Sequence, residues 1–162
     1  MRRTFLSLAI VAGLAIGLAA QARPDFSGTW TMDEGRSESP THEGFAGPVT
    51  WVIRQTPQEL IVDMKRGPKT ATLTYRLYEK APAGPAAGGV PSYRGYWEGD
   101  RLVTETAQNI QGQTVITREV RALEPGGQEM RVERLVQVEH GYTLRGAQNY
   151  NTAKDLFKKV AP

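Results

Sequence analysis

An alternation of apolar and polar residues dominates the chain after residue 48. In residues 49–55, VTWVIRQ, the apolar Val49, Trp51 and Ile53 fall on one face of an extended chain. Successive side chains of a strand point to opposite faces of a sheet, so this pattern predicts half-buried antiparallel strands. Comparable runs occupy residues 59–65, 70–78, 92–97, 101–107, 114–123, 129–139 and 142–146.

Turn residues separate these runs at short intervals. The pair Gly99 and Asp100 between two alternating runs is a strong hairpin signal. Other turn signals lie at residues 56–58, 111–113, 124–127 and 140–141. Together with the run that contains Trp30, the chain has about nine predicted strands. The pattern therefore predicts an all-β fold, as an antiparallel barrel or a sandwich.

Residues 79–91, EKAPAGPAAGGVP, break the alternation and are rich in Pro, Gly and Ala. Residues 34–48 form a second stretch of this kind. The blocks on either side of residues 79–91 are each too small to fold alone. We therefore expect a flexible loop at a barrel mouth, within one domain, rather than a linker between two domains.

The end of the chain has a helical pattern instead. In residues 151–160, NTAKDLFKKV, apolar residues from Ala153 to Val160 recur at the spacing of one helical face, and Asn151 or Thr152 suits the N-cap. We expect a short C-terminal helix that packs against the outside or the open end of the barrel.

The first 22 residues have the pattern of a secretory signal peptide. Two arginines follow the initiating methionine, an apolar run extends from Phe5 to Ala20, and Ala22 completes a small-x-small cleavage pattern. The apolar run is too short for a membrane span, so we expect no stable anchor after cleavage. Residues 23–162 are expected to be a single exported domain, periplasmic or extracellular, sent by the general secretory or the twin-arginine route.

Composition narrows the possible functions. The chain contains no cysteine, which excludes disulfides and a lipidated cysteine. Without its leader it has 18 Lys and Arg against 17 Asp and Glu, and no basic tract is interleaved with aromatic residues, so nucleic-acid binding is disfavoured. The two histidines, His42 and His140, lie far apart, and no nucleophile motif is present. We assign no catalytic residue, metal or cofactor.

Three stretches, DFSGTW at 25–30, YWEGDRLV at 96–103 and NYNTAKDLFKK at 149–159, resemble small secreted bacterial lipocalin-like (calycin-type) β-barrel proteins. The resemblance covers most of residues 25–160. It implies an up-and-down antiparallel barrel of about eight or nine strands with a terminal helix. It implies no particular activity, because the group is largely uncharacterised. The later Thr-Asp-Tyr motif of lipocalins is absent, which argues against their carrier role.

The Gly-x-Trp motif of lipocalins corresponds here to Gly28, Thr29 and Trp30. Phe26 and Trp30 share one face of a strand, and Gly28 between them allows another segment to approach closely. We expect these residues to close one end of the barrel. The resemblance implies that a basic residue, Arg145, packs on the tryptophan ring.

The candidate ligand contacts are strand aromatic residues and one arginine. They are Trp51, Tyr75, Tyr93, Trp97, Tyr142 and Arg121. Such aromatic residues either line a cavity or fill a core. Glu105, Glu119 and Glu133 lie on the same late strands as several arginines. An inward orientation would give a polar lumen. We favour an outward orientation with cross-strand ion pairs, because charge is usually solvated.

Three functions follow, in order of preference. The first is a non-catalytic binding protein for a small, mainly apolar or amphipathic ligand in the barrel. The second is a structural or protein-interaction module with a filled barrel and an exposed aromatic patch. The third is an enzyme that uses lumen carboxylates or arginines. The pattern leaves the oligomeric state open.

The signal peptide yields the first prediction. In its host, the exported protein is expected to have the intact mass of residues 23–162, because the leader is removed after Ala22. Mass spectrometry of the exported fraction measures this. Ala22→Phe, which blocks a small-residue cleavage site, is expected to retain the leader, whereas Gln21→Ala is expected to be processed normally. An exported protein that keeps residues 1–22 would contradict the assignment.

Overall fold

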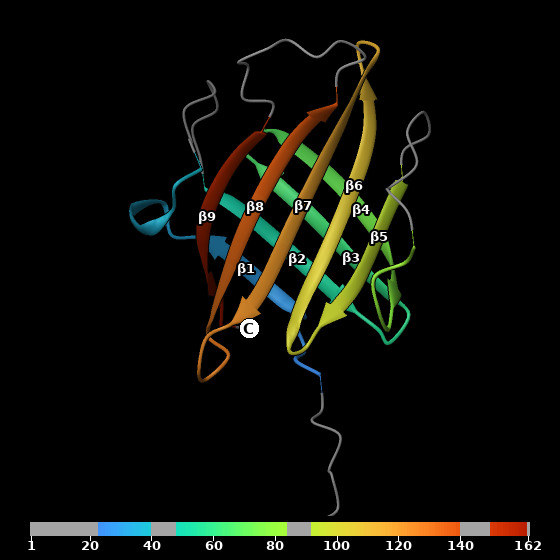
Figure 1. Ribbon diagram of the computed structural model, residues 1–162. Coiled ribbons are helices and arrows are strands. Elements are labelled where there is room, and N and C mark those ends of the chain that lie inside the picture. The colour runs from blue at the N-terminus through green and yellow to red at the C-terminus, as the bar shows by residue number, and fades with distance from the viewer. Residues whose placement is uncertain (1–22, 40–47, 84–91, 140–149, 162) are drawn as a thin grey trace, which may run out of the picture.

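The computed structural model describes residues 23–39, 48–83, 92–139 and 150–161 (Figure 1). Its elements are β1 (Gly28–Met32), the 3-10 helix η1 (Glu34–Arg36), β2 (Val49–Gln55), β3 (Glu59–Arg66), β4 (Lys69–Tyr78), β5 (Ser92–Glu98), β6 (Arg101–Ile110), β7 (Gln113–Leu123), β8 (Glu129–Glu139) and β9 (Tyr150–Lys159). Each strand pairs with the next, and β9 pairs with β1, which closes the sheet into a barrel. The predicted all-β barrel is confirmed.

The predicted signal peptide lies outside the described residues. Within the described part, no helix has the length and apolar character needed to span a bilayer.

One strand pair departs from the predicted up-and-down antiparallel order. β4 and β5 are parallel, with Arg76 opposite Arg94, whereas the other described pairs are antiparallel. A closed ring of nine strands cannot alternate direction throughout, because an odd number leaves two neighbours that run the same way. A parallel pair needs a return connection. Residues 79–91 connect these two strands along the chain, and residues 84–91 of the predicted loop lie outside the described part.

The predicted C-terminal helix is wrong. Residues 150–159 form β9, which pairs along its length with β8 and near its end with β1. Without β9, both neighbouring strands would present unpaired edges, and that tertiary hydrogen bonding outweighs the weak preference of a ten-residue segment for a helix. The apolar spacing was ambiguous, because Ala153 and Phe157, four residues apart, share a face in either structure.

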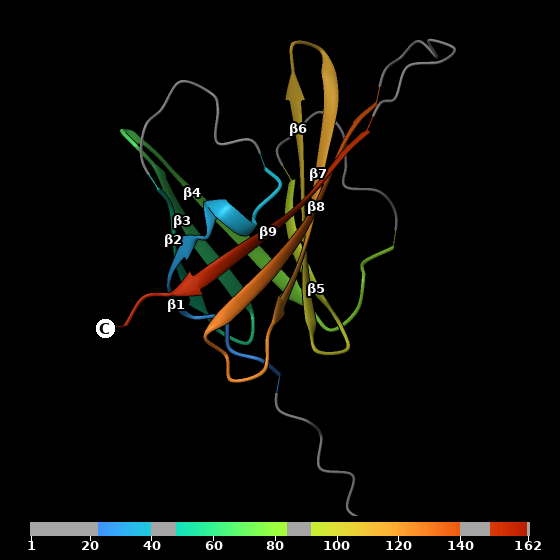
Figure 2. The same ribbon diagram turned by 90° about the vertical axis from the view of Figure 1, so that its left-hand side faces the viewer.

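The two ends of the barrel differ. Figure 2 shows β2–β4 and β6–β8 diverging toward the end where the β3–β4 and β6–β7 turns lie. Residues 23–27 enter at the opposite end, which is filled by buried apolar side chains that include Phe26, Trp30 and Trp97. The rings of Phe26 and Trp97 have centroids 6.3 Å apart. We call these the open end and the filled end.

Trp30 is fully buried in the filled end, and its Nε1 donates a hydrogen bond to the Phe26 carbonyl at 2.9 Å. Lys159 Nζ lies 5.3 Å from the centroid of the Trp30 ring. The Lys159 stem passes so close to Gly28 that a Cβ added there would lie 2.7 Å from Lys159 Cε. The cation over this tryptophan therefore comes from β9, while Arg145 lies outside the described residues.

The second prediction concerns Trp30. Trp30→Ala is expected to lower the free energy of unfolding by about 3–5 kcal/mol, because a large buried ring and its hydrogen bond are lost. Urea denaturation followed by circular dichroism measures the change. Tyr150→Ala, at a ring that is 58% exposed, is the control and is expected to change stability by less than about 0.5 kcal/mol. Equal losses in the two variants would contradict the role of Trp30 in closing the filled end.

Candidate functional site

Two cavities lie in the open half of the barrel. The first has a volume of about 420 Å³, and its apolar lining includes Met32, Val49, Trp51 and Met64. The second has a volume of about 310 Å³ and combines apolar and polar lining residues. Met64 and Arg134 line both cavities, which therefore adjoin at these two side chains.

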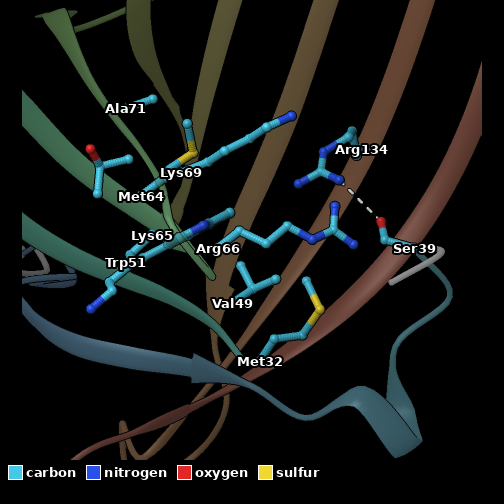
Figure 3. Close-up of a pocket in the computed structure, with 11 residues that line it drawn as sticks. Met32, Ser39, Val49, Trp51, Met64, Lys65, Arg66, Lys69, Ala71 and Arg134 are labelled. Carbon is cyan, nitrogen blue, oxygen red and sulfur yellow. Dashed lines mark hydrogen bonds between the residues drawn. The ribbon is translucent and has the colours of Figure 1, made fainter. Parts of the chain in front are cut away.

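Basic side chains surround the mouth of the first cavity. Figure 3 shows Arg66 and Lys69 extending from β3 and β4 toward Arg134 on β8. Arg66 and Lys69 are register partners on neighbouring strands, so both lie at the tip of the β3–β4 hairpin. Each already has an interaction partner within the chain.

A row of inward-facing polar residues crosses the wall of the second cavity. Thr104 on β6 lies opposite Glu119 on β7, which lies opposite Arg134 on β8, and all three line the cavity. Strand alternation places Arg121, two residues after Glu119 on β7, on the same inward face and closer to the filled end. Arg121 is almost fully buried and lines neither cavity. The polar row, Arg121 and the buried Asp155 on β9, which lies beside Arg134, together form a floor, which we call the polar floor.

Ion pairs hold the polar floor together. Glu119 accepts hydrogen bonds from Arg121 Nη2 at 2.5 Å and from Arg134 Nε at 2.9 Å. Arg121 Nη1 also donates to Thr104 Oγ1 at 2.5 Å. Arg134 Nη1 lies 3.5 Å from an oxygen of Asp155, a buried carboxylate on β9. The floor therefore contains two cations and two anions.

The guanidinium of Arg121 is sandwiched between this network and an aromatic ring. Its central carbon lies 5.2 Å from the centroid of the Trp51 ring, a cation–π geometry that partly replaces water around the buried charge. Its Nε–H is a buried donor with no acceptor among the described residues.

Glu119 in the polar floor and Tyr75 in the second cavity each keep one protonation state near neutral pH. Burial alone would raise the pKa of Glu119, but the charges of Arg121 and Arg134 and their hydrogen bonds outweigh burial and hold this pKa below its ordinary value. Burial raises the pKa of Tyr75, whose hydroxyl lies 3.3 Å from Thr106 Oγ1. Glu119 thus stays ionised and Tyr75 stays protonated, so neither is poised to exchange a proton.

Ser39 ties the segment after β1 to the polar floor. Its backbone N–H donates to Asp155 Oδ1 at 2.9 Å, and its hydroxyl donates to Asp155 Oδ2 at 2.6 Å. Arg134 Nη1 donates to the Ser39 hydroxyl at 3.0 Å. Since Ser39 also lines the first cavity, this segment forms part of the cavity wall.

The structure distributes the predicted ligand contacts over different places. Trp51 lines the first cavity and Tyr75 the second. Tyr93 packs edge-on against Tyr75, with ring centroids 6.0 Å apart. Trp97 belongs to the filled end, Arg121 lies beneath the cavities, and Tyr142 lies outside the described residues. Sequence reasoning did not select Arg134, Asp155 or Ser39.

The predicted outward orientation of the charged residues is wrong for Glu119 and Arg121. Both face inward, where they pair with each other, and Glu119 also pairs with Arg134. The prediction holds for Glu105 and Glu133, which face outward by alternation. Glu105 pairs there with Arg94 and accepts a hydrogen bond from the Tyr96 hydroxyl. Buried charge is tolerated at Glu119 because each partner is itself hydrogen-bonded.

The described residues contain no group of three or more potential ligands arranged to hold a metal ion. His42 and His140 lie outside them.

No protein-family model and no curated protein matches the sequence. Solved structures match the fold. A variant of the fluorescent protein UnaG is 17% identical with a TM-score of 0.48, over 85% of this chain and 97% of that one. Fatty-acid-binding protein 1 of Echinococcus granulosus is 16% identical with a TM-score of 0.50, over 84% of this chain and 98% of that one. The likeness to the latter is one of fold, a closed β-barrel.

The third prediction concerns pH. At about pH 7, Glu119→Gln is expected to be less stable than the wild type by about 3 kcal/mol, because the buried Arg121 and the half-buried Arg134 lose their shared counter-charge. The wild-type contribution of Glu119 declines below its ordinary pKa of 4.5 and is lost once the pH has fallen through the lower pKa of the folded state. The stability difference between the two proteins should therefore shrink on acidification.

Urea denaturation of both proteins between about pH 7 and pH 3 measures this difference. Carboxyl groups that do not share a partner with Glu119 titrate alike in both proteins and cancel in the comparison. A difference that stays constant with pH would show that Glu119 is not an ionised member of the polar floor.

Proposed function

We propose that the protein is a non-catalytic binding protein that takes up a small, mainly apolar ligand in the open half of its barrel. The adjoining cavities of about 420 and 310 Å³ carry this proposal. Their size falls in the range of small-molecule sites, roughly 300–1,000 Å³. Apolar walls with a few placed polar groups are also typical of such sites. A solved neighbour of the same fold is named for binding fatty acids, which is in keeping with this proposal.

The two other functions have less support. A structural or protein-interaction module is expected to have a filled barrel. Among the described residues, buried side chains fill the end that contains Trp30, whereas the open half is hollow. An enzyme with acid–base chemistry in the lumen needs a group that exchanges a proton near neutral pH. The pKa values of Glu119, Tyr75 and Arg134, which line the cavities, are shifted away from neutrality.

We also propose that binding takes place outside the cytoplasm, in the periplasm or beyond the cell. The pattern of residues 1–22 supports this. A ligand taken up there would reach the barrel through its open end, where Lys65, Arg66 and Lys69 line the mouth of the first cavity.

The fourth prediction tests occupancy of the barrel. Ala71 faces inward on β4, lines the first cavity and lies opposite Met64. Ala71→Trp is expected to fill the space where the cavities adjoin and to weaken binding of the uncharged apolar dye Nile red by at least about tenfold. A fluorescence titration measures the dissociation constant.

Thr74→Trp is the matched control, because Thr74 lies on the same strand with an exposed, outward-facing side chain. This variant is expected to bind the dye like the wild type. If the wild type does not bind the dye, or if both tryptophan variants bind it equally well, the ligand does not enter the open half of the barrel.

A further inference from the structure

The buried charges of the polar floor cancel. Arg121 and Arg134 contribute two positive charges, and Glu119 and Asp155 contribute two negative ones. Asp155 and Arg121 are each 1% exposed and Glu119 is 8% exposed, whereas the side chain of Arg134, which lines both cavities, is 25% exposed. In such a desolvated place, a charge added without a counter-charge is strongly disfavoured. The polar floor therefore presents a net charge of zero, not a positive charge, to a ligand.

The arginine donors that face the acidic partners are already engaged. Arg121 uses both terminal nitrogens, on Thr104 and Glu119. Arg134 uses Nε on Glu119 and Nη1 on Ser39. A ligand carboxylate placed at the floor would have to displace a protein carboxylate from these donors or lie beside it. Like charges at close range raise the cost of ionisation, so either arrangement opposes binding.

The other polar groups that line the second cavity are uncharged. They are Tyr75, Thr104, Thr106, Gln108 and Thr117. Hydroxyl and amide groups both donate and accept hydrogen bonds, so they can pair with a hydroxyl or a carbonyl of a ligand without changing the charge balance. The cavity is completed by apolar residues such as Leu73, Val115 and Val136.

The basic residues at the mouth do not alter this balance. Lys65 and Lys69 are exposed to solvent, and Arg66 and Lys69 already have partners within the chain. Charges in contact with water are screened over about 8 Å at physiological ionic strength. They favour the approach of an anion, but they leave the charge at the buried floor unchanged.

We propose that the ligand is an uncharged amphiphile, with a hydroxyl or carbonyl group at the polar floor and an apolar body in the adjoining cavities, and that Glu119 is the residue that excludes carboxylates. This inference rests on the proposed binding function and deepens it. It sets the floor apart from a site built to hold a fatty-acid carboxylate, because Glu119 already accepts from Arg121 Nη2 and Arg134 Nε, donors that such a group would use.

The test compares decanol with decanoate, two ligands with the same chain length and different head charge. Their affinities are measured by displacement of Nile red at about pH 8, where a free carboxylate is ionised. Three variants change the net charge of the floor, which is zero in the wild type because two cations and two anions cancel. Glu119→Gln gives a net charge of +1, Arg134→Gln gives −1, and the double variant restores zero. Glu133→Gln makes the same change as Glu119→Gln on the exposed outer face of β8.

The wild type is expected to bind decanol at least about tenfold more tightly than decanoate. Glu119→Gln is expected to shift this ratio at least about tenfold toward decanoate, and the double variant to return it to the wild-type value. Arg134→Gln should weaken decanoate further, and Glu133→Gln should change nothing. Circular dichroism checks the fold of each variant, and Arg134→Gln with the double variant still tests charge balance if Glu119→Gln does not fold.

Tighter binding of decanoate by the wild type would overturn the inference while leaving the binding function in place. If Lys69→Gln then removed that preference, the anion would be held at the mouth. A ratio that does not follow the net charge of the floor would also overturn it. If Nile red binds but neither ligand displaces it, the proposed ligand class is wrong. If the dye itself does not bind, the binding function fails as well.

Discussion

The carboxylate of Glu119 is the constraint on which the open half of the barrel depends. An ionised group inside a barrel persists only with counter-charges and hydrogen bonds, and Arg121 and Arg134 supply both. Their pairing fixes which faces of β7 and β8 point inward. A slip of one residue would turn these side chains outward and leave the carboxylate unpaired, so the network also specifies the register of the strands around it.

Closure of the barrel sets a second constraint. With nine strands, one neighbouring pair must be parallel, and here β4 and β5 pair through only three residues on each strand. Side chains strengthen the sheet across this short seam. The hydroxyl of Tyr75 on β4 contacts Thr106 on β6, and the ring of Tyr75 packs edge-on against Tyr93 on β5. The seam lies beside the second cavity, so Tyr75 and Thr106 both strengthen the sheet and line the cavity.

Much of the fold could be predicted from the sequence, because strands from residue 49 onward alternate with a clear period of two. The structure of residues 150–159 could not be predicted in this way, since the spacing of Ala153 and Phe157 fits a helix as well as a strand. Along TREVR, residues 117–121, polar side chains occupy both faces, so periodicity alone could not show that Glu119 faces inward. Its partners Arg134 and Asp155 come from other strands, and only the barrel register brings them together.

The buried charges themselves support a binding role over a purely structural one. Well-packed apolar residues in place of a buried ion-pair network often leave a protein equally or more stable. The filled end, with Phe26, Trp30 and Trp97, already provides an apolar core that does not involve the polar floor. The open half can therefore keep a hollow interior and a set of costly charges without loss of the barrel. Such an arrangement is in keeping with the proposal that a ligand is recognised there, in addition to its effect on strand register.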